Sequence, residues 1–475
     1  MHDLMIVSKR KAAGVLSVTS PFDGRELDSV PTCGPQHVED ALSVAYKLFR
    51  DRKSWMSVPE RIEILNKTAE IMSTQVEDLT LLAASEGGKP YQDSKVEVIR
   101  AIDGVHLCVE NLRAHAGSVI PLGTTKATMG RTAFTQKEPI GVVVAVSAFN
   151  HPLNLIVHQV GPAVATGCPV IVKPAADTPL SCIRFVQILR EAGLPDACCQ
   201  VLVASDRETA EKLVTDSRVG FFSFIGSAKV GWMLRSKLAR GARCALEHGG
   251  VAPVILAEPF DNDAALISIA KGGFYHAGQV CVSVQRVFVP TGKADEFAQA
   301  LANIAEKLVV GAPEDAATEV GPLIRHAEVD RVAEWVADAV ASGAKLLCGG
   351  KKISDSCYAP TVLLNPPTDA TVSTAEIFGP VVCVYGYDEI DDAVAQANSL
   401  PVAFQAAVFC DDITIANRLY CDLDASAIMI NDHSAFRDDV MPFAGLRESG
   451  LGVGGIPYTM EDMQIDKMMV VRALP

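Results

Sequence analysis

The chain has 475 residues, too many for one ordinary domain, so two or three compact units are expected. Its net charge is −15 and no basic stripe stands out, so nucleic acid is not an expected partner. The 13 cysteines are scattered without metal-type spacing, and we expect no disulfide, no metal site and a reducing, cytoplasmic setting. We find no signal peptide and no apolar run of membrane-spanning length, so no membrane association is expected.

Residues 36–118 are predicted to be mostly helical, because apolar residues recur at helical spacing in 58–80 and 96–116. From residue 140, short apolar strands alternate with helices. Strands are predicted at 140–147, 169–173, 200–203, 221–224 and 244–247, with helices at 153–166, 180–192, 208–215 and 229–239. This alternation predicts βαβ units and a doubly wound α/β sheet.

A second alternating region covers about 254–431. Its predicted strands are 284–289, 359–364, 381–387, 406–410 and 427–430, and helices are predicted at 263–275 and 329–341. Two segments, 121–139 and 463–472, fit neither region and are predicted to be protruding strands that pair with another subunit. An exposed edge strand is hazardous unless something covers it, so an oligomer is expected.

Polar residues follow the first strands at their carboxyl ends. Asn150 could aim its amide N–H at an oxyanion, or it could simply cap the next helix. Lys173 could reach a cofactor's ribose or phosphate, or it could be a solvated surface lysine. Gly226 and Ser227 form a turn into a helix whose free N–H groups could bind a pyrophosphate, although such helix caps are common.

Cys281 ends the run 278–281, and Glu247 ends a strand just before a glycine pair. A soft nucleophile and a carboxylate base suggest a thiol that attacks a carbonyl and a base that then admits water. The competing interpretation of one cysteine among 13 is a small buried apolar side chain. Further along, Glu376 and Phe378 could hold a ribose, or they could belong to a strand entry closed by a Gly-Pro turn.

Together and in this order, the motifs closely resemble the NAD(P)-dependent aldehyde dehydrogenase superfamily over nearly the whole chain. The matched motifs are 149–152, 173–175, 224–227, 246–250, 278–281 and 376–380, and 442–450 is a late glycine-rich loop. Within the superfamily, the chain resembles the branch with lactaldehyde, succinate-semialdehyde and phosphonoacetaldehyde dehydrogenases. The resemblance implies two doubly wound α/β domains and an oligomerisation flap. A Rossmann-type cofactor domain would span 1–120 and 140–247, a catalytic domain 248–455, and a β-strand flap 121–139 and 456–475.

The resemblance also implies roles for individual residues. Cys281 would be the nucleophile, Glu247 the base that activates water, and Asn150 part of the oxyanion hole. The implied product is a carboxylic acid, formed from an aldehyde through a thioacyl intermediate. Residues implied at the cofactor are Ser147, Phe149, Lys173, Ala176, Gly226, Ser227, Gly249, Glu376 and Phe378.

The cofactor implied by the resemblance is NAD or NADP. Many NAD-specific relatives carry glutamate three residues after the lysine, where its charge repels a 2′-phosphate. Here that residue is Ala176, so either cofactor is allowed, with NAD slightly favoured. His248 stands where the family usually has leucine, which could tune Glu247 or could be simple core packing.

The substrate pocket is predicted from family positions. Its residues are Arg100, His151, His158, Tyr275, His276, Phe436, Arg437 and Phe443. Histidines and arginines predict a small aldehyde that is polar or anionic, although each arginine could instead form a surface ion pair. Val280 replaces an arginine of the phosphonate enzymes, which weakens the expectation of a full phosphonate clamp.

Two other functions compete. A CoA-acylating aldehyde dehydrogenase would use a thiol in place of water, but such enzymes generally lack the glutamate found here as Glu247. A non-catalytic scaffold on the same fold would be indicated by loss of the cysteine, the glutamate or the asparagine, and all three are present. The expected partners are therefore a small aldehyde and further copies of the chain, as a homodimer or homotetramer.

Overall fold

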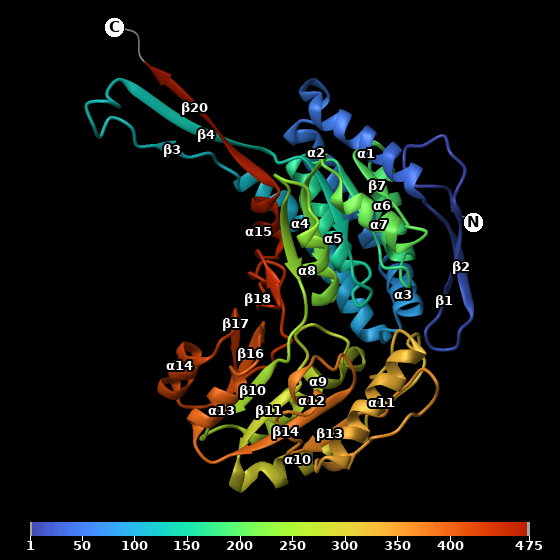
Figure 1. The fold of residues 1–475 in the computed structure, drawn as a ribbon, viewed down its shortest axis with the longest axis vertical. Helices are drawn as coiled ribbons and strands as arrows, with labels where there is room; N and C mark the ends of the chain where they lie inside the picture. Colours follow the sequence, from blue (N-terminus) through green and yellow to red (C-terminus); the bar gives the residue numbers. More distant parts are fainter. Residues whose placement is uncertain (1, 473–475) are drawn as a thin grey trace.

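The computed structural model describes residues 2–472 as two α/β lobes, from which a long β-strand arm projects (Figure 1). Each lobe is built around its own sheet with parallel strands at its centre. The predicted fold class, two doubly wound α/β units with an additional strand element, is therefore confirmed.

The sheet of the first lobe has six strands in the order β19-β9-β8-β5-β6-β7. All neighbours are parallel except β19, which runs antiparallel to β9. The strands are β5 (Val142–Val146), β6 (Val170–Lys173), β7 (Cys199–Val201), β8 (Val219–Ile225), β9 (Arg243–Glu247) and β19 (Gly450–Leu451). A separate hairpin precedes them, formed by β1 (Gly14–Thr19) and β2 (Glu26–Thr32).

Helices cover both faces of this sheet because β5 is apolar on both sides. Val143 and Ala145 pack in one core with α2, α4, α5 and α6, whereas Val142 and Val144 pack in another with α1, α7 and α8. The helices are α1 (Pro35–Arg50), η1 (Arg52–Ser54), α2 (Val58–Thr74), α3 (Val76–Gly87), α4 (Tyr91–Ala114), α5 (Asn154–Thr166), α6 (Leu180–Glu191), α7 (Arg207–Thr215) and α8 (Ala228–Ser236).

The second lobe has a seven-stranded sheet in the order β12-β13-β14-β11-β10-β16-β17, with a single large apolar core. Its strands are β10 (Pro253–Leu256), β11 (Arg286–Pro290), β12 (Lys345–Cys348), β13 (Thr361–Leu364), β14 (Val381–Tyr387), β16 (Gln405–Phe409) and β17 (Ala427–Ile430). Its helices are α9 (Asn262–Phe274), η2 (Tyr275–Gly278), α10 (Thr291–Ala305), α11 (His326–Ala341), α12 (Thr371–Thr374), α13 (Ile390–Ala397) and α14 (Ile413–Asp422). Two short strands, β15 (Val402–Ala403) and β18 (Leu446–Arg447), pair beside it.

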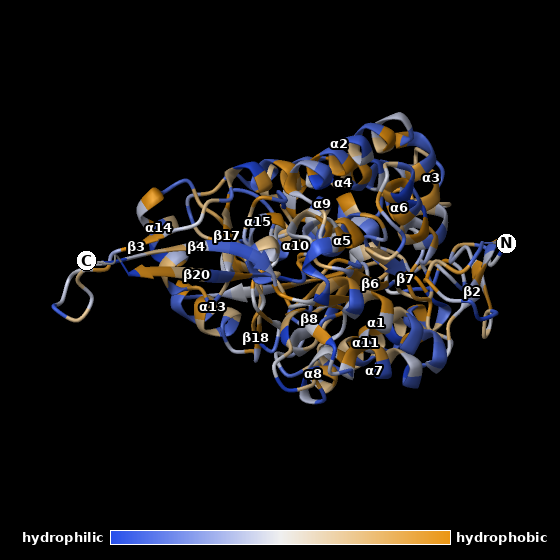
Figure 2. Cartoon of the chain, turned by 90° about the horizontal axis from the view of Figure 1, so that it is seen from above, coloured by the Kyte–Doolittle hydropathy of each residue, from blue (hydrophilic) through white to orange (hydrophobic). Residues whose placement is uncertain are grey.

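The arm consists of β3 (Val119–Ile120), β4 (Arg131–Pro139) and β20 (Gln464–Arg472). Strand β20 runs antiparallel to β4 over its whole length, from Pro139 opposite Gln464 to Arg131 opposite Arg472. Seen from above, the two strands leave the body together, and β20 carries apolar residues (Figure 2). Met468 to Val471 are exposed.

The structure differs from the sequence predictions at several elements. The helix predicted over 58–80 is two helices, because α2 ends at Thr74 and α3 begins at Val76, with Gln75 between them. The β1–β2 hairpin was not predicted. The segment 456–463, which was assigned to the flap, forms α15 (Ile456–Asp462), and Met460 and Met463 pack in the core of the first lobe. No helix in residues 2–472 combines the length and apolarity needed to cross a membrane.

Candidate active site

A cleft of about 710 Å³ lies between the two lobes. The first lobe lines it with the ends of strands β5, β6, β8 and β9 and the loops that follow them. The second lobe adds the loop after η2, the segment around Glu376 and the segment around Arg437. Ligands of doubly wound sheets bind beyond the carboxyl ends of the strands, as this cleft would allow.

Cys281 is half-buried in this cleft, just after a tightly turned segment. His276 and Ala277 have φ values of 50° and 53°, a left-handed backbone that costs about 1–2 kcal/mol per non-glycine residue. Gly278 also has positive φ, and a Cβ there would lie 2.2 Å from the carbonyl oxygen of Gly379. Burial, and then the charges of Glu247 and Glu376, raise the pKa of the Cys281 thiol well above its usual value. The thiol is therefore protonated at rest and needs a base.

Asn150 is buried, and its side-chain N–H donates to the carbonyl oxygen of Gln279 at 2.9 Å. This bond joins the loop after β5 to the loop that carries Cys281. Gln279 is itself held on three sides, because it donates to the carbonyls of His276 and Pro322 and accepts from the N–H of Ile324. Sequence reasoning missed Gln279, although its place between the glycine and the cysteine was visible.

A buried ion pair supports the same loop from behind. The Glu97 carboxylate accepts the N–H groups of Leu153 and Asn154, each at 2.9 Å, and also a hydrogen bond from Lys89. Both charged side chains are almost completely buried. These bonds fix the start of α5, and with it the position of Asn150.

Glu247 is the last residue of β9, where β19 pairs with it through Gly450. Burial raises the pKa of its carboxyl to about 7, against the opposing charge of Arg437. The N–H of Gly250, three residues on, donates to the carbonyl of Cys281 at 3.2 Å. The structure therefore brings Glu247, Cys281 and Asn150 to one end of the cleft, and a carboxyl with a pKa near neutrality suits a general base.

At the other end, the residues present fit a dinucleotide. Burial raises the pKa of Glu376 to about 8, against the opposing charge of Arg331, and its Oε1 is buried without a hydrogen-bond partner in the described chain. The hydroxyl of Ser147 is likewise buried without a hydrogen-bond partner in the described chain. Ser227 precedes α8 without a side-chain cap, which leaves the helix N–H groups free for a phosphate. These are unmet polar groups of the kind that ribose hydroxyls and phosphates satisfy.

The remaining predicted cofactor residues lie in the same cleft. Gly249 has no room for a side chain, since a Cβ there would lie 1.7 Å from Oε1 of Glu376. The rings of Phe149 and Phe378 meet edge to face at 5.9 Å. Lys173, Ala176 and Gly226 also line the cleft. Charged residues that sequence reasoning missed here are Asp177, Arg207, Arg325, Glu328 and Arg331.

Six of the eight residues predicted for the substrate also line the cleft, namely Arg100, His151, His158, Tyr275, Arg437 and Phe443. His276 and Phe436 do not. The His276 side chain is fully buried, because its left-handed backbone turns it toward the ring of His151, 6.3 Å away. Phe436 is 47% exposed, because it faces outward between Ala435 and Arg437.

Asp439, a residue not singled out from the sequence, organises this end of the cleft. It accepts hydrogen bonds from both Nε and Nη2 of Arg100, the former at 3.2 Å, and from Nε2 of His158 at 2.8 Å. Burial raises the pKa of Asp439, but the bond from His158 and the charge of Arg100 outweigh it and lower that pKa overall. The charge of Arg100 is thus already matched inside the protein.

Arg437 has no such carboxylate partner among residues 2–472. It donates to the carbonyl of Met441 at 3.1 Å, and its guanidinium lies 3.9 Å from the ring centre of Phe443. Burial lowers its pKa, while the charges of Glu247 and Asp439 oppose that effect. Arg437 is therefore a cation beside the reacting groups with donor capacity to spare.

His248 packs on the cofactor side. Its Nδ1 donates to the carbonyl of Gly226 at 2.8 Å, and its ring lies between Phe224 and Trp232. Gly231 makes this possible, since a Cβ there would lie 2.1 Å from the imidazole. Among the described residues, no group of three or more His, Cys, Asp or Glu side chains is arranged to hold a metal ion.

Comparison with known proteins agrees with this geometry. The model of the aldehyde dehydrogenase family matches residues 7–469. The 3-sulfolactaldehyde dehydrogenase of Priestia megaterium is 38% identical over 419 residues, which cover 88% of this chain and 87% of that protein. The lactaldehyde dehydrogenase of Methanocaldococcus jannaschii is 33% identical over 460 residues, covering 96% of this chain and 97% of that protein. Both relatives fall in the branch that the motifs predicted.

A solved structure gives the same result. The glyceraldehyde-3-phosphate dehydrogenase of Methanocaldococcus jannaschii, complexed with NADP, superimposes with a TM-score of 0.92 at 32% identity, covering 98% of this chain and 100% of that one. The prediction of an NAD(P)-dependent enzyme is thereby confirmed. The chain belongs to the aldehyde dehydrogenase family, oxidoreductases that oxidise aldehydes with NAD or NADP.

Proposed function

We propose that this chain oxidises a small, polar or anionic aldehyde to its carboxylic acid, with Cys281 as nucleophile and Glu247 as base. The observation that carries the proposal is the meeting of a half-buried thiol with a carboxyl whose pKa is about 7 in one cleft. A base of that pKa can accept a proton near neutral pH and release it again.

The reaction begins when Glu247 takes the proton of the Cys281 thiol and the sulfur attacks the aldehyde carbon, which gives a hemithioacetal. That proton leaves Glu247 before the hydrolysis step. The amide of Asn150 and the backbone N–H of Cys281 stabilise its oxyanion. The nicotinamide of NAD or NADP supplies the oxidant, as the acceptor of hydride. Cys281 is left as a thioester, and Glu247 then removes a proton from the water that cleaves it. The carboxylic acid leaves and the thiol is restored.

The residues proposed to bind the cofactor either have polar groups without a hydrogen-bond partner or leave room for the cofactor in the cleft. Glu376 would hold the nicotinamide ribose, Ser227 and Gly226 the pyrophosphate, and Lys173 the adenosine ribose. Ser147, Phe149, Gly249 and Phe378 would shape the nicotinamide end. Ala176 carries no charge to exclude a 2′-phosphate, so both cofactors are proposed, with NAD preferred.

The substrate proposal rests on Arg437. Arg100 is already matched by Asp439, so of the two arginines predicted for the substrate, Arg437 is the one left to meet an acidic group. His151, His158 and Tyr275 supply further polar contacts, and Phe443 supports the guanidinium. Among the predicted residues, His276 acts only through the ring of His151. The relative named for 3-sulfolactaldehyde, an aldehyde with a sulfonate group, supports an anionic substrate.

The test is initial-rate reduction of NAD and NADP by the purified chain with a panel of aldehydes. Glycolaldehyde, lactaldehyde, succinate semialdehyde and sulfo- or phosphonoacetaldehyde stand beside hexanal and benzaldehyde. We expect an anionic aldehyde to be oxidised fastest. Arg437→Met should raise the KM for that aldehyde about tenfold or more and leave the KM for hexanal unchanged. Preference for hexanal would refute the anionic substrate. The exposed-cysteine control Cys421→Ala should keep parental activity, whereas reduction that persists in Cys281→Ala would refute the nucleophile. Dependence on added CoA would indicate the acylating reaction.

The arm supports an oligomer. Strand β20 is the edge of its sheet, and Met468 to Val471 are exposed there. A second copy that covers this edge would bury them, giving a homodimer or homotetramer. Light scattering of the purified chain tests this, and a monomer at micromolar concentration would contradict it. All 13 cysteines are free, which supports a reducing, cytoplasmic setting.

A further inference from the structure

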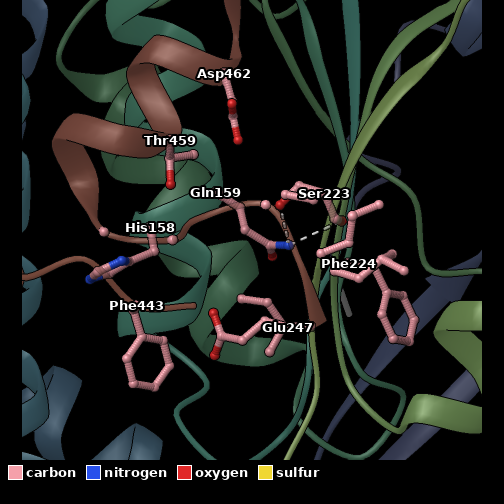
Figure 3. Close-up of a pocket in the computed structure, with 15 residues that line it drawn as sticks. His158, Gln159, Ser223, Phe224, Glu247, Phe443, Thr459 and Asp462 are labelled. Atoms are coloured by element: carbon pink, nitrogen blue, oxygen red, sulfur yellow. Dashed lines mark hydrogen bonds between the residues drawn. The ribbon is translucent and has the colours of Figure 1, made fainter. Parts of the chain in front are cut away.

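A second, smaller cavity adjoins the large cleft at Glu247 and Phe443. Its volume is about 30 Å³, enough for about two water molecules. Its walls come from α5, β8, β9, the loop after β19 and α15. The residues that line this cavity but not the cleft include Gln159, Ser223, Ala245, Gly452, Thr459 and Asp462 (Figure 3).

Gln159, which lines this cavity, has a buried polar atom without a hydrogen-bond partner among the described residues. The amide nitrogen of Gln159 donates to the carbonyls of Val146 and Ser223 and to the Ser223 hydroxyl, at 3.0–3.2 Å. This fixes the amide, and its Oε1 is left without a partner in a side chain that is 1% exposed. A buried carbonyl oxygen without a hydrogen bond is costly, so an ordered water is expected beside it.

Two carboxylates lie at the ends of this cavity, with Gln159 and Thr459 between them (Figure 3). A glycine lies beside each of the two carboxylates. A Cβ at Gly454 would lie 3.4 Å from Oε2 of Glu247, and one at Gly452 would lie 3.5 Å from Oδ2 of Asp462. Asp462 is partly exposed, as is Thr459, so this end reaches solvent.

The proposed reaction requires an outlet for protons. Aldehyde, water and oxidised cofactor give carboxylate, reduced cofactor and two protons, one from the Cys281 thiol and one from water. Glu247 holds one proton at a time, so a proton taken from the thiol must leave before Glu247 can act on water. Substrate and cofactor fill the large cleft during this interval.

We propose that Glu247 passes its proton through water in the small cavity, held by Gln159, to Asp462 at the surface. The O–H bond of the Glu247 carboxyl breaks as one forms on the cavity water, and that water gives a proton to Asp462, which loses it to solvent. No electrons change hands. Burial raises the pKa of Asp462, with Glu461 adding to this and Arg243 opposing it, which suits a group that accepts and releases protons. The inference rests on the proposed function.

Two variants test this path independently. Asp462→Asn removes the acceptor without changing its shape, and Ala245→Leu fills the cavity from β9, because Ala245 lines it opposite Gly452. Asp466→Asn is the matched control, because Asp466 is an exposed carboxylate nearby that pairs with Lys137 and does not line the cavity. Each variant is first checked for an unchanged melting temperature relative to the parent.

The measurement is a single turnover with enzyme in excess. Reduced cofactor reports attack and oxidation, and carboxylate in quenched samples reports hydrolysis. We expect reduced cofactor to form at the parent rate while hydrolysis slows about tenfold in both variants, less than loss of the base itself would cause. Imidazole, a small proton acceptor, should restore hydrolysis in Asp462→Asn.

Parental hydrolysis in Asp462→Asn and Ala245→Leu, equal to that of the control Asp466→Asn, would overturn the path and leave the proposed function intact. A slowed Asp462→Asn that imidazole does not restore would also overturn it, since the defect would then be structural. A parent enzyme that forms no reduced cofactor with any aldehyde would withdraw both the proposed function and this inference.

Discussion

The charges of Glu247 and Asp439 both raise the pKa of Arg437, but the two carboxyls differ in their hydrogen bonding. Asp439 is buried with two hydrogen bonds from Arg100 and one from His158, which lower its pKa. Glu247 has no side-chain hydrogen bond within the described chain, and burial raises its pKa to about 7. The difference indicates what each carboxyl is for. A fully paired carboxylate is fixed in one charge state and holds the side chains that line the cleft in position, whereas an unpaired carboxyl can exchange a proton.

Replacing the unpaired carboxyl should have the largest effect on rate. Glu247→Gln should slow hydrolysis by roughly 10²–10⁴-fold, because the general base is lost, and it should also slow the formation of reduced cofactor, because Glu247 takes the proton of the Cys281 thiol. Stopped-flow absorbance and quenched-flow carboxylate assays separate the two steps. The exposed residue Glu448 gives the control, and Glu448→Gln should behave as the parent. Hydrolysis at the parent rate in Glu247→Gln would remove Glu247 from the mechanism.

Asn150→Ala should have the next largest effect. One oxyanion donor is worth about 2.7–4 kcal/mol of barrier, so turnover should fall roughly a hundredfold or more. The loss should appear in the formation of reduced cofactor, before hydrolysis, since the oxyanion forms on first attack. Steady-state kcat together with the single-turnover rate measures it. Near-normal formation of reduced cofactor would show that the Asn150 amide only ties its loop to Gln279.

The paired carboxylate should matter for stability. Asp439→Asn leaves Arg100 without its countercharge and should lower the free energy of unfolding by about 3 kcal/mol, as breaking a buried ion pair does. The adjacent exposed residue gives a matched control, and Asp438→Asn should change little. Urea denaturation measures both. If Asp439→Asn were as stable as the parent while Glu247→Gln were strongly destabilised, the contrast between the two carboxyls would be wrong.

The pH dependence sharpens the same contrast. Because the folded pKa of Glu247 is about 7, hydrolysis should fall roughly tenfold per pH unit below that value as the base becomes protonated. The raised pKa also means that Glu247 lowers stability as pH rises from its ordinary 4.5 to about 7, since the unfolded chain loses its proton first. Glu247→Gln should remove both effects. A hydrolysis rate that stays flat from about one pH unit below this pKa to about one unit above it would contradict the assignment.

The sequence predicted the two sheets well where apolar runs were continuous. Strand β5 and its neighbours are buried on both faces, so their residues are apolar throughout and easily distinguished. The β1–β2 hairpin was missed because Val18 and Val30 are nearly its only buried residues, too few for a clear pattern. The break between α2 and α3 was missed because both helices continue the same apolar spacing across Gln75.

The candidate site, too, could be predicted from the sequence only in part. Cys281, Glu247 and Asn150 could be identified because each stands in a short motif of known order. Asp439 could not, since its partners Arg100 and His158 are 339 and 281 positions away in the chain. His276 and Phe436 were placed in the pocket from family positions, but the left-handed backbone at His276 goes with a fully buried side chain and Phe436 is exposed at the surface.

The pairing of β20 with β4 has a consequence for synthesis. Gln464 lies opposite Pro139, and Met460 and Met463 complete the core between α4 and α5, so the first lobe depends on residues translated more than 300 positions later. Contacts of such sequence separation form slowly. The growing chain therefore carries an unfinished core and an unpaired β4 until residues 456–472 emerge, the interval in which chaperone binding would protect it.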